Sequence, residues 1–115
     1  MTNETRIGRL ETLPNEIENA ERHVIELAKT VDKARDTLKE KENAIILGEI
    51  SGMELTGKNA ETRAAQMKGF TEVERDQLRQ AEEELANYRV RYNRLLNDFS
   101  ALRAIARILA GREVA

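Results

Sequence analysis

The chain contains no cysteine and no tryptophan, and it has only two Phe and two Tyr among its 115 residues. Without cysteine it forms neither disulfides nor thiolate metal sites, which fits a reducing compartment. Aromatic side chains supply much of the buried area of compact cores. With 3% aromatic and 35% charged residues, the composition disfavours a broad core and favours a thin seam of Leu, Ile, Val and Ala between long helices.

Long apolar runs are also missing. No stretch approaches the ~20 apolar residues that a membrane span needs. The first residues lack the basic and apolar regions of a signal peptide. We therefore expect a cytoplasmic protein that makes no use of a membrane. The net charge of −2 gives no general argument for or against nucleic acid as a partner.

The sequence does contain an uninterrupted heptad repeat in its C-terminal third. Its two interleaved series are Leu78, Leu85, Tyr92, Phe99 and Ala106, and Ala81, Tyr88, Leu95, Leu102 and Leu109. The N-terminal half carries a similar pair of series: Leu10, Ile17, Val24, Val31, Leu38 and Ile45, and Leu13, Ala20, Leu27 and Ala34. Residues at these spacings share one face of a helix, so each stripe must be covered by another helix.

These patterns predict one elongated, all-α domain over residues 1–115. Its predicted segments are a helix at 12–47, a loop at 48–58, a short helix at 59–68 and a final helix at 71–110. The loop is predicted because three of the six glycines fall within it.

Residues with known end preferences set the helix limits. Pro14 fits the first turn of a helix that Thr12 caps, with a frayed or kinked turn before it. Asn59 is the expected cap of the short helix. The remaining signals are a capping box of Thr71 with Glu74, and stops at Gly69 and Gly111.

The distribution of charge predicts how the two long helices pair. Residues 1–28 hold six acids and three bases, net −3, whereas residues 86–115 hold six arginines and two acids, net +4. Residues 71–85 are net −4, from six acids and two bases. An antiparallel hairpin brings the basic end against the acidic end, and a parallel pair would bring the two acidic segments together. We therefore expect an antiparallel, coiled-coil-like hairpin.

Apolar residues outside the two stripes predict self-association. Leu96, Ile105 and Ile108 lie off the stripe, in a segment at 95–110 that is apolar around most of its circumference. A helix apolar on more than one face is buried on more than one face. We expect a dimer or tetramer, most simply two hairpins forming a four-helix bundle. The alternative is a monomer whose excess apolar surface is covered by Ile7, Leu10 and Leu13.

The arginines of the final helix are the main candidate binding feature. Together with Leu96, Ile105 and Ile108, the predicted partner or oligomer surface contains Arg89, Arg91, Arg94, Arg103 and Arg107. Arginine suits bidentate contacts with phosphate or carboxylate. Three uses remain open for these side chains: pairing with the acidic N-terminal half, binding a partner protein with an acidic surface, and binding nucleic acid. Tyr88 and Tyr92 fall on the stripe, which makes them poorly placed for stacking on bases.

No arrangement of residues indicates catalysis, so we expect no enzyme, no cofactor and no metal. Residues 52–59 nearly match a phosphate-binding P-loop, but Asn59 stands where the Mg²⁺-binding hydroxyl is required. A glycine-rich helix connection explains these residues better. His23 is the only histidine, and no Glu-x-x-His pair accompanies it. We expect it at the surface or at the edge of the helix interface.

Residues 57–66 (GKNAETRAAQ) and 71–75 (TEVER) resemble the central segment of small helical proteins that bacteriophages and prophages encode. The resemblance covers about twenty residues, and the flanking helices share only their heptad character with that group. It implies a phage accessory protein that acts by binding, either to host machinery or to replication and recombination factors. The expected function is therefore binding of a partner protein, with a nucleic-acid accessory role through the arginine-rich helix as the alternative.

Overall fold

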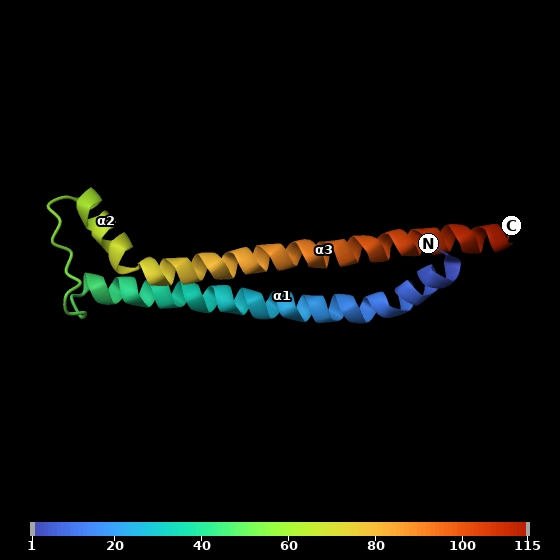
Figure 1. Cartoon of the computed structure of the whole chain (residues 1–115), viewed down its shortest axis with the longest axis horizontal. Helices are drawn as coiled ribbons and strands as arrows, with labels where there is room; N and C mark the ends of the chain where they lie inside the picture. Colours follow the sequence, from blue (N-terminus) through green and yellow to red (C-terminus); the bar gives the residue numbers. More distant parts are fainter. Residues whose placement is uncertain (1, 115) are drawn as a thin grey trace. The chain divides into compact units, whose positions relative to one another are not determined.

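The computed structural model of the chain describes residues 2–114 and the side chains of residues 2–112. Within that range it is all-α, with α1 (Asn3–Ile46), α2 (Ala60–Phe70) and α3 (Glu72–Val114), and no strand (Figure 1). The predicted helical hairpin with a short connector helix is confirmed. Met1 and Ala115, the two ends of the predicted domain, lie outside the described residues.

Both long helices contribute to two compact units. Unit 1 combines Met1–Glu26 with Ala86–Ala115, and unit 2 is Leu27–Leu85. In unit 2, Lys41 of α1 pairs with Glu74 of α3, and Arg35 pairs with Glu82. Residue numbers therefore fall along α1 as they rise along α3, which is the antiparallel arrangement that the charge distribution predicted.

The two heptad stripes form the core of each unit. All ten residues of the α3 stripe, and all ten of the α1 stripe, are buried or half-buried. The most buried in unit 1 are Leu13, Ala20 and Leu102, and in unit 2 Leu27, Val31, Leu38, Ile45, Ala81 and Leu85. The predicted stripes are therefore confirmed, and the buried apolar residues of the described chain all lie on them.

The predicted start of α1 at Thr12 is wrong, because the helix begins at Asn3. The hydroxyl of Thr2 accepts a hydrogen bond from the Thr5 N–H at 3.1 Å, which caps the first turn. Pro14 consequently lies inside the helix and removes one internal hydrogen bond. Figure 1 shows α1 bending toward its N-terminal end, as an internal proline would cause. Leu13, the residue before Pro14, is fully buried, and its burial contributes in the opposite direction.

The C-terminal stop predicted at Gly111 is also wrong, since α3 continues to Val114. A glycine inside a helix costs only ~1 kcal/mol relative to alanine, so it does not by itself end one. The short helix α2 likewise continues through Gly69 to Phe70. Its predicted cap is confirmed, because the Asn59 side chain accepts from the Thr62 N–H at 2.8 Å.

An ordered connector joins α1 to α2. Gly48 has φ +70°, and the N–H groups of Gly48 and Glu49 donate to the carbonyls of Ile45 and Ala44, a Schellman ending of α1. Gly57 donates its N–H to Gln66 Oε1 at 2.9 Å. A Cβ at Gly57 would lie 2.8 Å from the backbone nitrogen of Arg63, so only glycine fits there. These contacts hold the connector against α2.

Thr71 separates α2 from α3, but its predicted capping box takes a different form. Its fully buried hydroxyl donates to the Met67 carbonyl at 2.7 Å and accepts from Arg75 Nε at 2.8 Å. The Glu74 carboxylate, the expected second member of the box, instead accepts a hydrogen bond from Lys41 at 2.6 Å. Thr71 therefore fixes the α2–α3 junction, and Glu74 is left to bind α1.

The Lys41–Glu74 pair is a polar layer within the seam of unit 2. Lys41 follows Ala34 by seven residues, and Glu74 precedes Ala81 by seven, so both occupy stripe positions. Their side chains are 24% and 15% exposed, and Glu74 Oε2 is buried without a hydrogen-bond partner. The hydrogen bond from Lys41 lowers the pKa of Glu74, against the opposing effect of burial. A single polar layer of this kind favours one register over its neighbours.

Truncation of the seam should destabilise the protein in proportion to burial. Leu102→Ala removes a side chain that is 7% exposed, and we expect a loss of about 2–5 kcal/mol in the free energy of unfolding. Leu95→Ala, at a half-buried position, should cost less. Urea denaturation measures both values. Ile108→Ala, 57% exposed, is the control and should change little; a similar cost at all three positions would contradict the seam.

The ion pair should make stability depend on pH. Because the pKa of Glu74 is lower in the folded chain than its ordinary 4.5, the pair stabilises the fold above that pH and loses its contribution as the pH falls through the folded-state pKa. Glu74→Gln should therefore destabilise the protein at neutral pH and differ less from the parent near about pH 3. Unfolding measured across this range tests it; a constant difference would show that the carboxylate charge plays no part.

Candidate functional site

The seam loses its apolar character at the end of unit 1 where α1 begins. The stripe positions of α1 that precede Leu10 and Leu13 by seven residues are Asn3 and Arg6. The residues of α3 in this region are apolar, among them Ile105, Ala106 and Leu109. The Arg6 guanidinium donates to the Asn3 side chain at 3.2 Å, within α1. Two polar side chains thus occupy positions where apolar residues would have covered α3.

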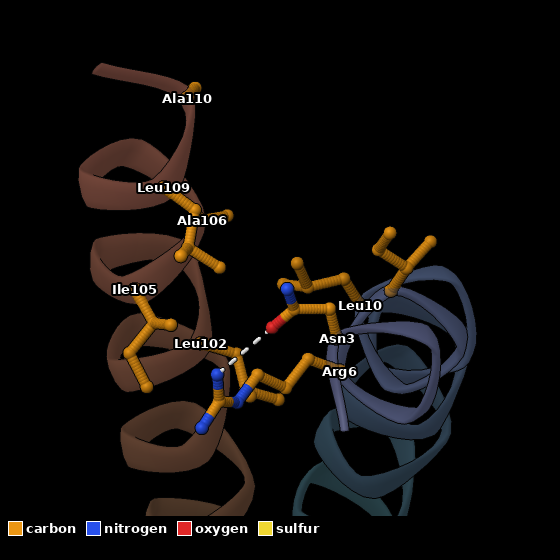
Figure 2. A pocket seen from close by; sticks show the side chains of 9 residues that line it. Asn3, Arg6, Leu10, Leu102, Ile105, Ala106, Leu109 and Ala110 are labelled. Carbon is orange, nitrogen blue, oxygen red and sulfur yellow. Dashed lines mark hydrogen bonds between the residues drawn. The ribbon is translucent and has the colours of Figure 1, made fainter. Parts of the chain in front are cut away.

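This mismatch leaves a groove of about 200 Å³, which we call the terminal groove. Figure 2 shows Asn3, Arg6 and Leu10 on one side of it, facing Leu102, Ile105, Ala106 and Leu109 on α3. The complete lining is Asn3, Arg6, Ile7, Leu10, Leu102, Ile105, Ala106, Leu109 and Ala110. Leu13 is fully buried but Ile7 is 57% exposed. The N-terminal residues therefore cover the excess apolar surface only in part.

A second hollow of about 350 Å³, with more charged residues in its lining, continues from the terminal groove. It shares Arg6, Leu102 and Ile105 with it, and adds Arg9, Asp98 and Ala101. Arg9 makes a two-pronged hydrogen bond to both carboxylate oxygens of Glu16, at 2.7 and 2.8 Å. That bond raises the pKa of Arg9, and the charges of Glu16 and Asp98 act in the same direction. The hollow thus combines an apolar wall with fixed charges.

The predicted surface residues of α3 lie on two opposite sides of the helix. Leu96 and Ile105 are nine residues apart, which is half a turn beyond two full turns at ~100° per residue. Spacings of fourteen, eleven and three residues place Arg91, Arg94 and Ile108 with Ile105, and spacings of seven, seven and eleven residues place Arg89, Arg103 and Arg107 with Leu96. We call these sets the Ile105 flank and the Leu96 flank. The residues therefore form two surfaces on α3 and do not line one continuous edge.

All five of these arginines are exposed. The Arg91 guanidinium lies 5.8 Å from the centre of the Tyr88 ring, and that of Arg103 lies 5.6 Å from the Phe99 ring, so both pack over seam aromatics. Among the side chains that the structure describes, none of the five pairs with a carboxylate of α1 or α3. The expected pairing with the acidic N-terminal half is absent from this region, and the guanidinium groups are available to other molecules.

The other candidate chemistry serves the fold. In the P-loop-like segment, the Gly57 N–H binds Gln66 and the Asn59 side chain caps α2, so both groups have partners within the connector. The His23 ring packs 4.2 Å from the Tyr88 ring at the edge of the interface. Over residues 2–112, no three His, Asp or Glu side chains gather closely enough to hold a metal ion.

Comparisons with protein-family models, with curated proteins and with solved structures find no match to the chain. Over the described residues, no helix has both the length and the apolar character that crossing a bilayer demands. The terminal groove and the two flanks of α3 are therefore interpreted from their own geometry and charge.

Filling the terminal groove should stabilise unit 1. Arg6→Leu places an apolar side chain at a stripe position beside Leu102 and Ile105, and we expect unfolding to cost about 1 kcal/mol more than in the parent. Chemical denaturation monitored by circular dichroism measures the change. Arg22→Leu is the matched control, because Arg22 is 72% exposed. Equal effects of the two substitutions would show that Arg6 does not face an apolar wall.

Proposed function

We propose that this chain is a non-enzymatic, self-associating helical protein that acts in the cytoplasm by binding a partner protein. The observation that carries the proposal is the terminal groove, where Ile105 and Leu109 of α3 are only half-buried. Exposed Ile108 extends this apolar surface along the Ile105 flank. Apolar patches of this kind, rimmed by polar residues, are typical of interaction sites. The resemblance of residues 57–75 supports a role as a phage accessory factor or an inhibitor of host machinery.

The charges around the groove indicate the chemistry of the partner. Arg6 lines the groove, and Arg91 and Arg94 lie on the same side of α3 as Ile105, about four and about three turns earlier. Arginine without a carboxylate partner in its own chain favours carboxylates on the molecule that binds. A short amphipathic segment with apolar anchors and acidic neighbours fits both features.

Binding of nucleic acid is the alternative function, and the exposed, unpaired arginines of α3 favour it. Phosphate recognition needs cations of this type. Two features weigh against it. The Ile105 flank carries two isoleucines as well as its two arginines, and Tyr88 and Tyr92 are half-buried in the seam, where they do not stack on bases.

Affinity capture from a bacterial lysate tests the proposal. The parent chain should recover a partner protein in stoichiometric amount. Ile105→Asp and Arg6→Leu should each reduce recovery at least about tenfold, since they place a charge in the groove or fill it. Arg6→Leu is the more informative variant, because it is expected to gain stability while it loses binding.

Val73→Asp is the matched control for this experiment. Val73 is 64% exposed and belongs to unit 2, whereas the terminal groove and the Ile105 flank belong to unit 1. It should capture as much partner as the parent. The proposal would be contradicted if the two groove variants recovered as much partner protein as the parent does. Retardation of DNA or RNA that weakens steeply with salt and is lost on Arg94→Ala would favour the alternative.

A further inference from the structure

The Leu96 flank of α3 has an acidic counterpart on α1. Glu4, Glu11, Glu18 and Glu21 follow one another at seven, seven and three residues, so they share one side of α1. All four are exposed. Glu18 pairs with Arg22 at 2.6 Å, whereas the other three form no ion pair with any described side chain. We call this set the acidic row.

The acidic row and the Leu96 flank lie on the same side of unit 1. Ile7 falls between Glu4 and Glu11 in the row, and Ala110 follows Arg103 by seven residues on the flank. Both Ile7 and Ala110 line the terminal groove, so the two sides meet there. The opposite side carries Arg9 and Asp98, whose charges interact with each other. One face of unit 1 is therefore acidic along α1 and basic along α3.

The charges also match in level along the helices. Tyr88 lies against His23, which places Arg89 close to the level of Glu21. At the other end of unit 1, the lining of the terminal groove places the first turns of α1 at the same height along the helices as residues 102–110. Arg103 and Arg107 therefore lie at about the height of Glu4. Each basic group has an acidic group beside it at the same height, although the two do not pair within the chain.

We propose that a second copy of this chain covers this face, through a two-fold axis parallel to the helices. That rotation sets α1 of one copy over α3 of the other while keeping the level of every residue. Glu21 then meets Arg89 of the second copy, and Glu4 meets Arg103 and Arg107, with each contact made twice. The alternative two-fold axis lies in the plane of the interface and is perpendicular to the helices. It would set α1 over α1 and α3 over α3, so acidic residues would face acidic residues and basic residues would face basic ones, which charge repulsion disfavours.

Apolar residues on the same face give this association its burial. Leu96 lies between Arg89 and Arg103, and the acidic row is interrupted by Ile7 and Ile25, which are 57% and 47% exposed. Removing such side chains from water contributes roughly 25 cal/mol per Å². The result is a four-helix bundle of unit 1 in which neighbouring helices are antiparallel and opposite in charge.

Reversal of charge tests the interface by sedimentation equilibrium, at about 50 mM and about 500 mM salt. The parent should have twice the 13.1 kDa mass of the chain, with weaker association at high salt. Glu21→Arg and Arg89→Glu should each raise the dissociation constant at least about tenfold, because each sets like charges together at two symmetric places. The double variant should return it to within about threefold of the parent.

Glu61→Arg is the matched control, since it makes the same change of charge on exposed α2, outside unit 1, and should leave the dissociation constant unchanged. Circular dichroism verifies that each variant is folded. A parent that is monomeric at about 100 µM, a dimer that both single variants leave intact, or a double variant that stays monomeric would each overturn the proposal.

The proposed dimer specifies the self-association included in the proposed function, and it rests on that proposal. Its failure is distinguishable, because a monomer that still captures a partner through the terminal groove would leave partner binding standing.

Discussion

The burial of the two heptad stripes against each other is the constraint on which the structure depends. Each long helix has an apolar stripe that it cannot cover alone, and with few aromatic residues the chain has no second core to add. Stability therefore comes from a long row of small contacts such as those of Leu38 and Leu85.

Two interruptions of the seam show how a polar side chain acts differently according to what faces it. In unit 2, Lys41 faces Glu74, and the pair closes the layer with a 2.6 Å contact. In unit 1, Arg6 faces Leu102 and Ile105, finds a partner only in Asn3 on its own helix, and leaves the terminal groove open. The first interruption favours a register, and the second creates a surface on which another molecule can dock.

The separation of α3 into two flanks gives its exposed residues distinct uses. The Ile105 flank is continuous with the terminal groove, so it belongs to the proposed partner site. The Leu96 flank lies beside the acidic row of α1, so its charges suit a second copy of the chain. Because Leu96 and Ile105 point to opposite sides of the helix, the two associations use different flanks of α3, and they share Ile7, which lines the terminal groove and also lies within the acidic row.

The sequence by itself determined the helices, their antiparallel pairing and the seam. Heptad spacing places the apolar residues on one face of each helix, and the distribution of charge along the chain selects the antiparallel pairing. It also contained the signal for the Lys41–Glu74 layer, because both residues fall on the seven-residue series, although only their contact identifies a pair. The start of α1 at Asn3 and the run of α3 through Gly111 depended on tertiary packing, which outweighs the local penalties of Pro14 and glycine. Only the tertiary structure decided which apolar positions remain uncovered and which charges stay unpaired, because both depend on what the facing helix places at the same level.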